Sequence, residues 1–298
     1  MVVASPLRRT FAEEKSATLA RAISQSLAER PLSKGPPNGL ESLEAELVRH
    51  LNDGNAALPA VPAVAIAGLR MAYLPNVNLS SLAQFVEQDP FTAARFLAVA
   101  NSALYYRGFR TASVRDALMR MGMSQVREIL ASLAHGVMLP KYQELLVAHT
   151  ERATIAGRCA LAVNAELRLN YDTAYLCGLL HNLGEARVLR ILADLPSPHD
   201  GPRVVHELVE RYHAHAGAQL AEKWNLHSDI VQACALHHDE QHAESRPVQI
   251  AMLSDLFAEL STRPYKRPTS EHAARWKRLG VSDGQADAIL RAVREQLP

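Results

Sequence analysis

The chain has 298 residues, of which 48% are hydrophobic and 21% are charged, and its formal net charge is +1. This length allows one large or two small domains, and the composition is that of a soluble globular protein. The balanced charge excludes a global field that would draw the chain to nucleic acid or to a membrane surface.

The N-terminal segment 1–55 is predicted to be an extension ahead of the main domain. Segment 8–30 has the pattern of an amphipathic helix, and the Pro- and Gly-rich stretch 31–39 indicates an exposed linker. Segment 41–51 predicts a short amphipathic helix.

Segment 56–140 is predicted to be a first block of closely spaced helices. It starts with the two prolines of "LPAVP" at 58–62, and Ser80 or Ser81 is predicted to cap the next helix. Asp89 followed by Pro90 predicts a capped helix start with proline in the first turn. Further helices are predicted at 113–121 and 124–138.

Segment 141–262 is predicted to be a second helical block, followed by a tail at 263–298. The tail carries eight Lys/Arg and four Asp/Glu, and we interpret it as a solvated helical pair rather than a nucleic-acid patch. The helices are predicted at 141–168, 172–193, 203–223, 228–238, 247–261, 270–279 and 283–296.

The cysteines and the apolar stretches bear on the compartment. Cys159, Cys177 and Cys234 are widely spaced and read as small buried residues in a reducing environment. No stretch looks long enough and apolar enough to span a bilayer, and no signal peptide is evident. We therefore expect a cytoplasmic location and no membrane partner.

Histidines and one aspartate recur at positions where the predicted helices should face inward. Inward-facing His and Asp are costly unless they are paired, hydrogen-bonded or bound to metal. Neutral imidazole nitrogens and carboxylate oxygens suit divalent transition metals, and ligands from several packed helices can converge in a bundle. The candidate metal ligands, in chain order, are His149, His181, His215, His237, His238 and Asp255.

This ordered series resembles the HD superfamily of metal-dependent phosphohydrolases, and its layout is closest to the HD-GYP branch. The first block resembles the HDOD domain, the HD-related output domain of bacterial signalling proteins. The motifs that carry this resemblance are Leu58 to Pro62, Asp89-Pro90, Asn101-Ser102, and Ala117-Leu118 with Gly122. The segment "HAHAGAQLAEKWNLHSDIVQACALHH" resembles the second half of that family.

The resemblance covers about residues 56–262 and implies an all-α, multi-helix HDOD architecture. It implies an N-terminal helical subdomain, 56–140, packed on an HD-like bundle, 141–262. It also implies bacterial signal transduction, usually without demonstrated catalysis.

Two residues depart from the HD pattern at the positions nearest the metals. Asn182 stands where the resemblance implies an aspartate that bridges two metal ions, and a neutral amide offers one weak donor oxygen. Glu185 stands where HD-GYP enzymes have a lysine that helps to bind phosphate, and an acid there would repel a phosphate substrate. A two-metal clamp should therefore be lost, although His149, His181 and Asp255 could still hold one metal.

These features favour a non-catalytic signalling module that binds another signalling protein, with a degenerate HD site. One alternative is a phosphohydrolase or phosphodiesterase with a one-metal site, and another is a sensor that binds a nucleotide or cyclic dinucleotide without hydrolysis. No cofactor is expected, and the alternative is one divalent Fe, Mn, Zn or Mg ion, bound with or without catalysis. Nucleic acid is not an expected partner.

The stretch "SALYYRGFR", 102–110, mixes aromatic residues with arginines. Such a mixture could stack on a nucleotide base or anchor a partner protein. The interpretation that the sequence favours is a partly buried loop between two helices.

Overall fold

The computed structural model consists of helices joined by loops, with no strand among the residues it describes. The predicted all-α class is therefore confirmed. The predicted helix 8–30, linker 31–39 and proline-rich start 58–62 lie outside the described residues. Those described are 40–53, 63–74, 76–134, 142–195, 201–224, 226–262 and 264–297.

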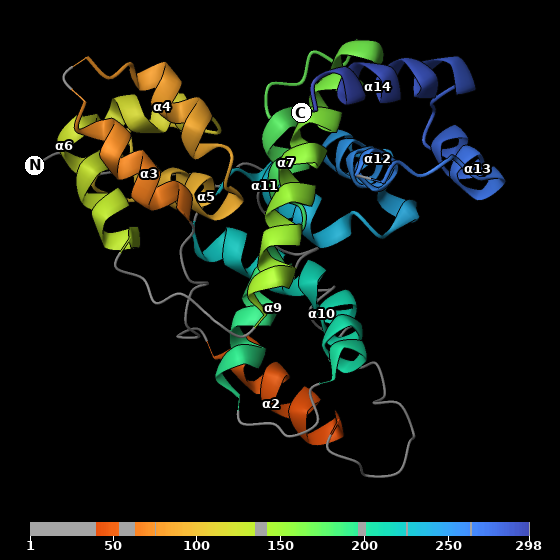
Figure 1. The fold of residues 1–298 in the computed structure, drawn as a ribbon, viewed down its shortest axis with the longest axis horizontal. Coiled ribbons are helices and arrows are strands. Elements are labelled where there is room, and N and C mark those ends of the chain that lie inside the picture. Colours follow the sequence, from red (N-terminus) through yellow and green to blue (C-terminus); the bar gives the residue numbers. More distant parts are fainter. Residues whose placement is uncertain are drawn as a thin grey trace, which may run out of the picture.

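The first group of helices forms a subdomain, on the left in Figure 1. Its members are α3 (Ala63–Ala72), α4 (Leu79–Val86), α5 (Pro90–Ala100) and α6 (Val114–Ala134). Asp89 caps α5 as predicted, because its carboxylate accepts a hydrogen bond from the Thr92 N–H at 2.7 Å. The predicted cap of α4 is wrong, since Asn78 rather than Ser80 or Ser81 occupies that position and accepts from the Ser80 N–H at 2.8 Å.

The helices predicted at 113–121 and 124–138 form one element, α6, that is kinked at Gly122. This glycine has φ 76° and ψ 162° inside an otherwise helical run. A positive φ favours glycine because it has no Cβ to clash with the backbone. The predicted break between two helical segments is therefore present at this residue.

The second group of helices is the bundle that carries the histidines. The helix predicted at 172–193 is in fact two helices, because the chain breaks at His181 and Asn182. The members are α7 (Gln143–Glu166), α8 (Ala174–Leu180), α9 (Leu183–Asp194), α10 (Pro202–Lys223), α11 (Ser228–Leu236), a short 3₁₀ turn (Glu240–His242) and α12 (Arg246–Ser261).

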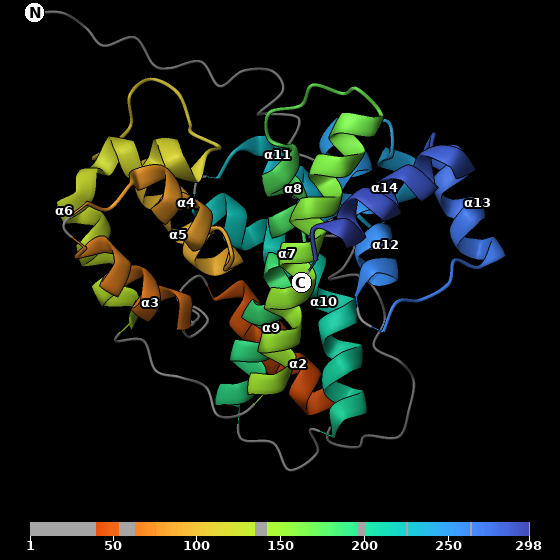
Figure 2. The ribbon, with the colours of Figure 1, turned by 45° about the horizontal axis from the view of Figure 1, so that its top comes forward.

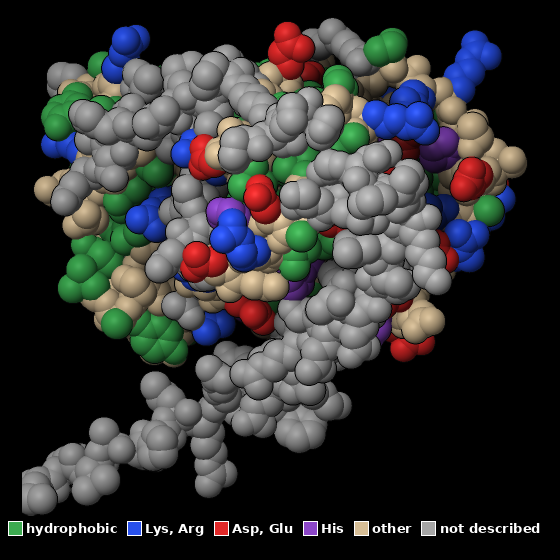
Figure 3. Space-filling model, turned by 90° about the horizontal axis from the view of Figure 1, so that it is seen from below, with side chains coloured by type: hydrophobic (Ala, Val, Ile, Leu, Met, Phe, Trp, Pro, Cys, Tyr) green, Lys and Arg blue, Asp and Glu red, His purple; other side chains and the backbone are tan. Residues whose placement is uncertain are grey.

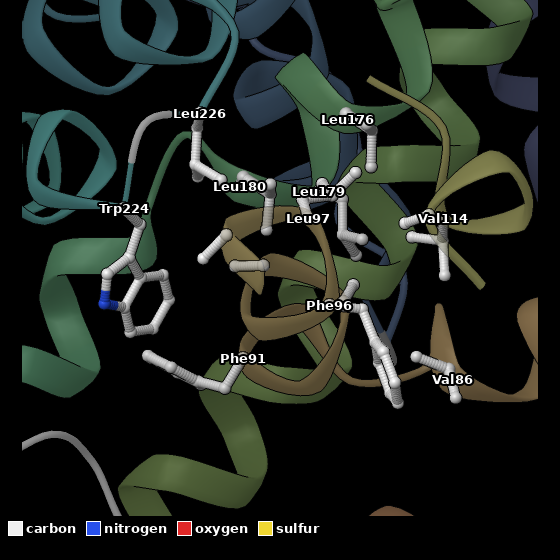
Figure 4. Close-up of a cluster of buried hydrophobic side chains, with 14 of the residues drawn as sticks. Val86, Phe91, Phe96, Leu97, Val114, Leu176, Leu179, Leu180, Trp224 and Leu226 are labelled. Atoms are coloured by element: carbon white, nitrogen blue, oxygen red, sulfur yellow. The ribbon is translucent and has the colours of Figure 1, made fainter. Parts of the chain in front are cut away.

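The subdomain and the bundle share one hydrophobic core. Figure 4 shows Phe96 and Leu97 of α5 beside Leu176 and Leu179 of α8, and all four side chains are buried. Burial of this apolar surface, at about 25 cal/mol per Å², favours a single cooperative unit.

The C-terminal helices α13 (Ser270–Arg278) and α14 (Asp283–Glu295) cover the outer side of α7 and α12 (Figure 1). Trp276 stacks on Phe257 with ring centroids 6.2 Å apart, and both rings are buried. The predicted helical pair of the tail is therefore present, and one of its faces is part of the core.

Helix α2 (Leu40–Asn52) packs against α9 and α10 (Figures 1 and 2). Leu43, Leu47 and Leu51, four residues apart, are buried on one stripe. The buried Glu44 carboxylate accepts a hydrogen bond from the Tyr212 hydroxyl at 2.7 Å. This part of the extension is thus docked on the bundle.

The surface carries mixed charge, as the composition predicts. Figure 3 shows basic and acidic side chains interspersed over the face seen from below. None of the described helices combines the length and the apolar character needed to cross a membrane.

Candidate functional site

The break between α8 and α9 places two polar residues inside the bundle. His181 ends α8 and Asn182 starts α9, and their exposed fractions are 1% and 6%. The His181 Nδ1–H donates to the Gly178 carbonyl at 2.7 Å, so in the neutral ring the Nε2 atom carries the lone pair. In a continuous α-helix, successive side chains point about 100° apart around the helix axis. The break between α8 and α9 releases His181 and Asn182 from this spacing.

Glycine allows α9 to approach α10 closely next to this break. A Cβ on Gly184 would overlap the carbonyl oxygen of His213 and the backbone nitrogen of Gly217. The two helix backbones are therefore in direct contact here. This contact sets the position of Asn182 relative to His213.

Three histidines from α10 and the end of α11 bring their ring nitrogens together. The His213 Nε2 atom lies 3.2 Å from His237 Nε2 and 2.9 Å from His238 Nε2. One nitrogen from each of the three rings falls within a group whose atoms are all within 4.8 Å of one another. We call His213, His237 and His238 the histidine triad.

Backbone contacts set the tautomers of two triad members. The His213 Nδ1–H donates to the Val209 carbonyl at 2.9 Å, and the His237 Nδ1–H donates to the Ala233 carbonyl at 2.9 Å. A carbonyl only accepts, so in the neutral rings both Nε2 atoms are lone pairs that face each other. Two such lone pairs at 3.2 Å repel unless a proton or a cation lies between them.

Two members of the triad, His237 and His238, have lowered pKa values that favour the neutral ring. Burial and the neighbouring His238, His181 and His213 hold the pKa of His237 well below its usual range. Burial and His213 lower the pKa of His238 to about 4, although Asp255 acts in the opposite direction. Neutral imidazole is the form that binds divalent transition metals.

Sequence reasoning placed His215 in the cluster, whereas the structure places His213 there. The two residues are on the same helix, and two positions correspond to a turn of about 200°. His213 is buried and lies four residues after Val209 and three before Ala216, both of which are buried. His215 lies near Arg187 instead. The pKa of His215 is lowered mainly by burial and to a smaller extent by the positive charge of Arg187. The helical spacing of the apolar residues was the signal that could have identified His213.

Asp255 on α12 lies beside His181 at the edge of the triad. Its Oδ1 atom is 3.6 Å from His181 Nε2, and the His181 and His237 rings are 4.9 Å apart. Burial raises the pKa of Asp255, but the interactions with His181, His237 and His238 outweigh it and hold the carboxyl ionised. An anion therefore lies next to the converging imidazoles.

His149 on α7 is oriented by an acid from α9. Its Nδ1–H donates to the Glu185 Oε2 at 3.1 Å, and its Nε2 atom is buried with no hydrogen-bond partner within the described part of the chain. Arg152, one turn along α7, also donates to the Glu185 carboxylate. From the sequence, Glu185 is expected to repel a phosphate. In the structure, its carboxylate accepts hydrogen bonds from His149 and Arg152.

Arg187 is engaged elsewhere and does not take the place of a phosphate-binding lysine. Its buried guanidinium donates to the carbonyl of Ala216 at 3.0 Å and to that of Leu51 at 3.1 Å. These bonds connect α9 to α10 and to α2.

The site fits a divalent metal ion at the triad. Three imidazole nitrogens converge there, as in three-histidine zinc sites. The predicted ligands His149, His181 and Asp255 do not form such a group of three within 4.8 Å among the described residues. Among the described residues, further buried atoms without a hydrogen-bond partner include His149 Nε2, His181 Nε2 and Asn182 Oδ1.

The described residues form a helical protein with a histidine-rich centre, and comparison with known proteins identifies its family. A family model described as the HDOD domain matches residues 58–240, which is more than half of the chain. The chain belongs to the HDOD domain family.

Three relatives illustrate the range of the similarity. An uncharacterized protein of Treponema pallidum is 26% identical over 216 residues, covering 68% of this chain and 42% of that protein. Ribonuclease Y of Thermobifida fusca is 30% identical over 190 residues, covering 60% of this chain and 33% of the relative. The chain thus spans less than half the length of these curated relatives. The MmoQ response regulator of Methylococcus capsulatus shares the fold, with a TM-score of 0.63 at 22% identity over 80% of this chain and 99% of that chain.

The Glu185 contacts predict an acid-sensitive contribution to stability. Burial raises the pKa of Glu185, but His149, Arg152 and His213 outweigh it and lower that pKa from 4.5 to about 2. The contribution of the ionised carboxylate is therefore complete above about pH 4.5 and is lost as the pH falls toward 2. We expect Glu185→Gln to lower the free energy of unfolding by about 1–3 kcal/mol at pH 7, and by less below pH 4.5, in denaturant titrations.

A matched control is Glu240→Gln, at an exposed glutamate that pairs with Arg278. Exposed ion pairs contribute little, so this variant should unfold like the wild type at each pH. Equal effects of the two variants would contradict the assigned role of Glu185.

Proposed function

We propose that this chain is a non-catalytic signal-transduction module that acts by binding another protein, with a degenerate HD site at its centre. The observation that carries the proposal is Asn182, which is buried at the break between α8 and α9 where the HD pattern has a bridging aspartate. A neutral amide offsets none of the repulsion between two divalent cations. A two-metal clamp for activation of water therefore lacks its central anion.

The contacts of Glu185 support the same proposal. The position that a phosphate-binding lysine occupies in HD-GYP enzymes holds an acid that is bonded to His149 and Arg152. Glu185 is an acid and does not bind a phosphoryl group. Arg187 is not free to do so, because its guanidinium is hydrogen-bonded to backbone carbonyls.

We further propose that the histidine triad binds one divalent ion, such as Fe, Mn or Zn, which stabilises the junction of α10 and α11. The converging Nε2 atoms, with separations of 2.9 and 3.2 Å, support this proposal. A bound ion would replace repulsion between lone pairs by ligation, and binding to the native state alone raises stability.

The test of the non-catalytic proposal is a turnover assay on the purified protein. Bis(p-nitrophenyl) phosphate is incubated with the protein and added Mn²⁺, Fe²⁺ or Zn²⁺, and the metal content is measured in parallel. We expect at most one metal per chain and no turnover above that of the metal alone. Metal-dependent turnover that disappears in His213→Ala would contradict the proposal.

The rival function is a phosphodiesterase with a one-metal site. The buried Nε2 atoms of His149 and His181, which have no hydrogen-bond partner within the described residues, favour it because they could ligate an ion or bind a substrate. Similarity to Ribonuclease Y over 60% of the chain also favours it. A short single-stranded RNA is therefore included as a second substrate in the same assay.

Restoring the bridging acid is a direct test of the mapping onto the HD pattern. Asn182→Asp is expected to raise the affinity for Mn²⁺ by about tenfold or more, because it adds an anion beside the neutral histidines. Isothermal titration of wild type and variant measures the change. Asn164→Asp, on a half-buried asparagine of α7 outside the site, is the control. An unchanged affinity in Asn182→Asp would show that residue 182 does not face the ion.

A further inference from the structure

The loop between α5 and α6 presents apolar side chains to solvent. The exposed fractions are 80% for Leu104, 64% for Phe109 and 41% for Tyr106, and Met119 on α6 is 50% exposed. Figure 2 shows this loop, in yellow, projecting from the subdomain. Clustered exposed apolar residues, unlike single ones, mark interaction sites.

Hydrogen bonds at its base hold the loop in this conformation. The buried Asn101 amide donates to the Thr111 carbonyl at 3.0 Å, and its oxygen accepts from the Thr111 N–H at 2.8 Å. The Tyr105 hydroxyl donates to Gln125 of α6 at 2.8 Å. The loop is therefore preorganised, which lowers the entropic cost of binding a partner. These bonds also explain the Asn-Ser motif that the sequence shows at this point.

The same loop carries positive charge that the described residues leave unneutralised. Arg107 and Arg110 are exposed, and Arg120 of α6 lies over the Phe109 ring at 4.4 Å. The ion pairs that arginines form within the described residues involve other positions, namely Arg152, Arg190, Arg211 and Arg278. The loop therefore combines exposed aromatic rings with arginines that have no acidic partner there, a composition typical of binding hot spots.

We propose that this arginine–aromatic surface, formed by Leu104, Tyr106, Arg107, Phe109, Arg110 and Arg120, docks an acidic segment of a partner protein in which carboxylates alternate with apolar side chains. The proposal rests on the proposed function, since it names the surface through which that function acts. Carboxylates would pair with the exposed guanidinium groups of Arg107 and Arg110, and the apolar side chains would cover Leu104 and Phe109. Arg120 holds the Phe109 segment, since it donates to the Phe109 carbonyl at 3.0 Å.

Charge complementarity selects this occupant over the others. Residues 1–39 contain six basic and three acidic side chains, so the chain's own N-terminal segment is repelled by the arginines. A second copy would bring an identical basic surface against the first. A nucleic acid would match the arginines but would leave the aliphatic Leu104 and Met119 without an apolar partner.

The experiment compares partner capture by two charge-matched variants of the full chain. The surface variant is Arg107→Glu, Phe109→Ala and Arg110→Glu. The control is Tyr265→Ala, Lys266→Glu and Arg267→Glu, which removes one exposed ring and two exposed bases elsewhere. Tagged proteins capture partners from a nuclease-treated lysate of the source organism, and cross-linking with mass spectrometry identifies the contacting segment.

We expect the surface variant to lose capture of the wild-type partner by at least tenfold and the control to retain it within twofold. The cross-linked segment should be acidic and contact loop 102–110, and capture should weaken with added salt.

If the surface variant captures the partner as well as the wild type does, the arginine–aromatic surface is not the docking site, but the proposed function still stands. Absence of any specific partner for the wild type overturns the proposed function itself. If the cross-linked segment of the partner is basic, or if nuclease treatment of the lysate abolishes capture, the partner does not bind through an acidic segment. Should the triple variant fail to fold, as judged by circular dichroism, the single change Arg107→Glu at an exposed position takes its place, with Arg267→Glu as control.

Discussion

Replacing His213 by alanine is expected to lower the affinity of the protein for Zn²⁺ or Mn²⁺ by on the order of 100-fold or more. The His213 Nε2 atom lies within 3.2 Å of the corresponding atoms of both His237 and His238, so its loss leaves two ligands in place of three. Competition with a chromogenic chelator measures the affinity, and circular dichroism confirms that the variant remains helical.

The control for this prediction is His215→Ala on the same helix. His215 lies about 200° around α10 from His213, near Arg187, and is not part of the triad. We expect its affinity for metal to stay within about twofold of the wild type. If His215→Ala loses metal and His213→Ala retains it, the triad is not the binding site and the prediction made from residue order is the better one.

Gly184→Ala is expected to destabilise the protein by about 3 kcal/mol or more. The added methyl group would overlap the His213 carbonyl and the Gly217 nitrogen, which are backbone atoms and cannot rotate away. Relief requires α9 to move away from α10, and that movement would also separate Asn182 from the triad. Urea denaturation measures the free energy of unfolding, and the metal affinity of the folded variant should fall as well.

Gly284→Ala in α14 provides the matched control. A Cβ at this glycine meets no atom within 4 Å, and the residue is helical. Alanine there should raise the free energy of unfolding by about 0.5–1 kcal/mol, because glycine is the poorer helix former. Similar destabilisation by both changes would show that the close contact of α9 and α10 is not the cause.

Local features of the fold were predictable because they depend on neighbours in the sequence. The Asp89 cap, the kink at Gly122 and the helices α13 and α14 follow from short-range hydrogen bonds, from allowed backbone angles and from apolar periodicity. The family resemblance, carried by motifs spread over the chain, agrees with the match over 58–240.

Two differences between the predictions and the structure arose where a local pattern was ambiguous. The apolar run before His181 continues into α9 without a proline. Asn182 and Gly184 are both tolerated inside helices, so they give only a weak local signal for the turn at Asn182. The pair His213 and His215 offers two equally plausible ligands when only residue order is considered. The choice between them depends on which face of α10 is turned toward α11.

Residue identity and local periodicity are enough to predict that this chain is helical, that it resembles the HDOD family, and that Asn182 stands where this resemblance implies a bridging acid. The packing of the helices was needed to show that His213 joins His237 and His238, that Glu185 holds His149 and Arg152, and that hydrogen bonds of Asn101 hold the loop in which Tyr106 and Phe109 are exposed. Each of these is a contact between residues 10 to 36 positions apart. Such contacts depend on how the helices pack, through backbone approaches such as that of Gly184 to α10, and no local pattern encodes them.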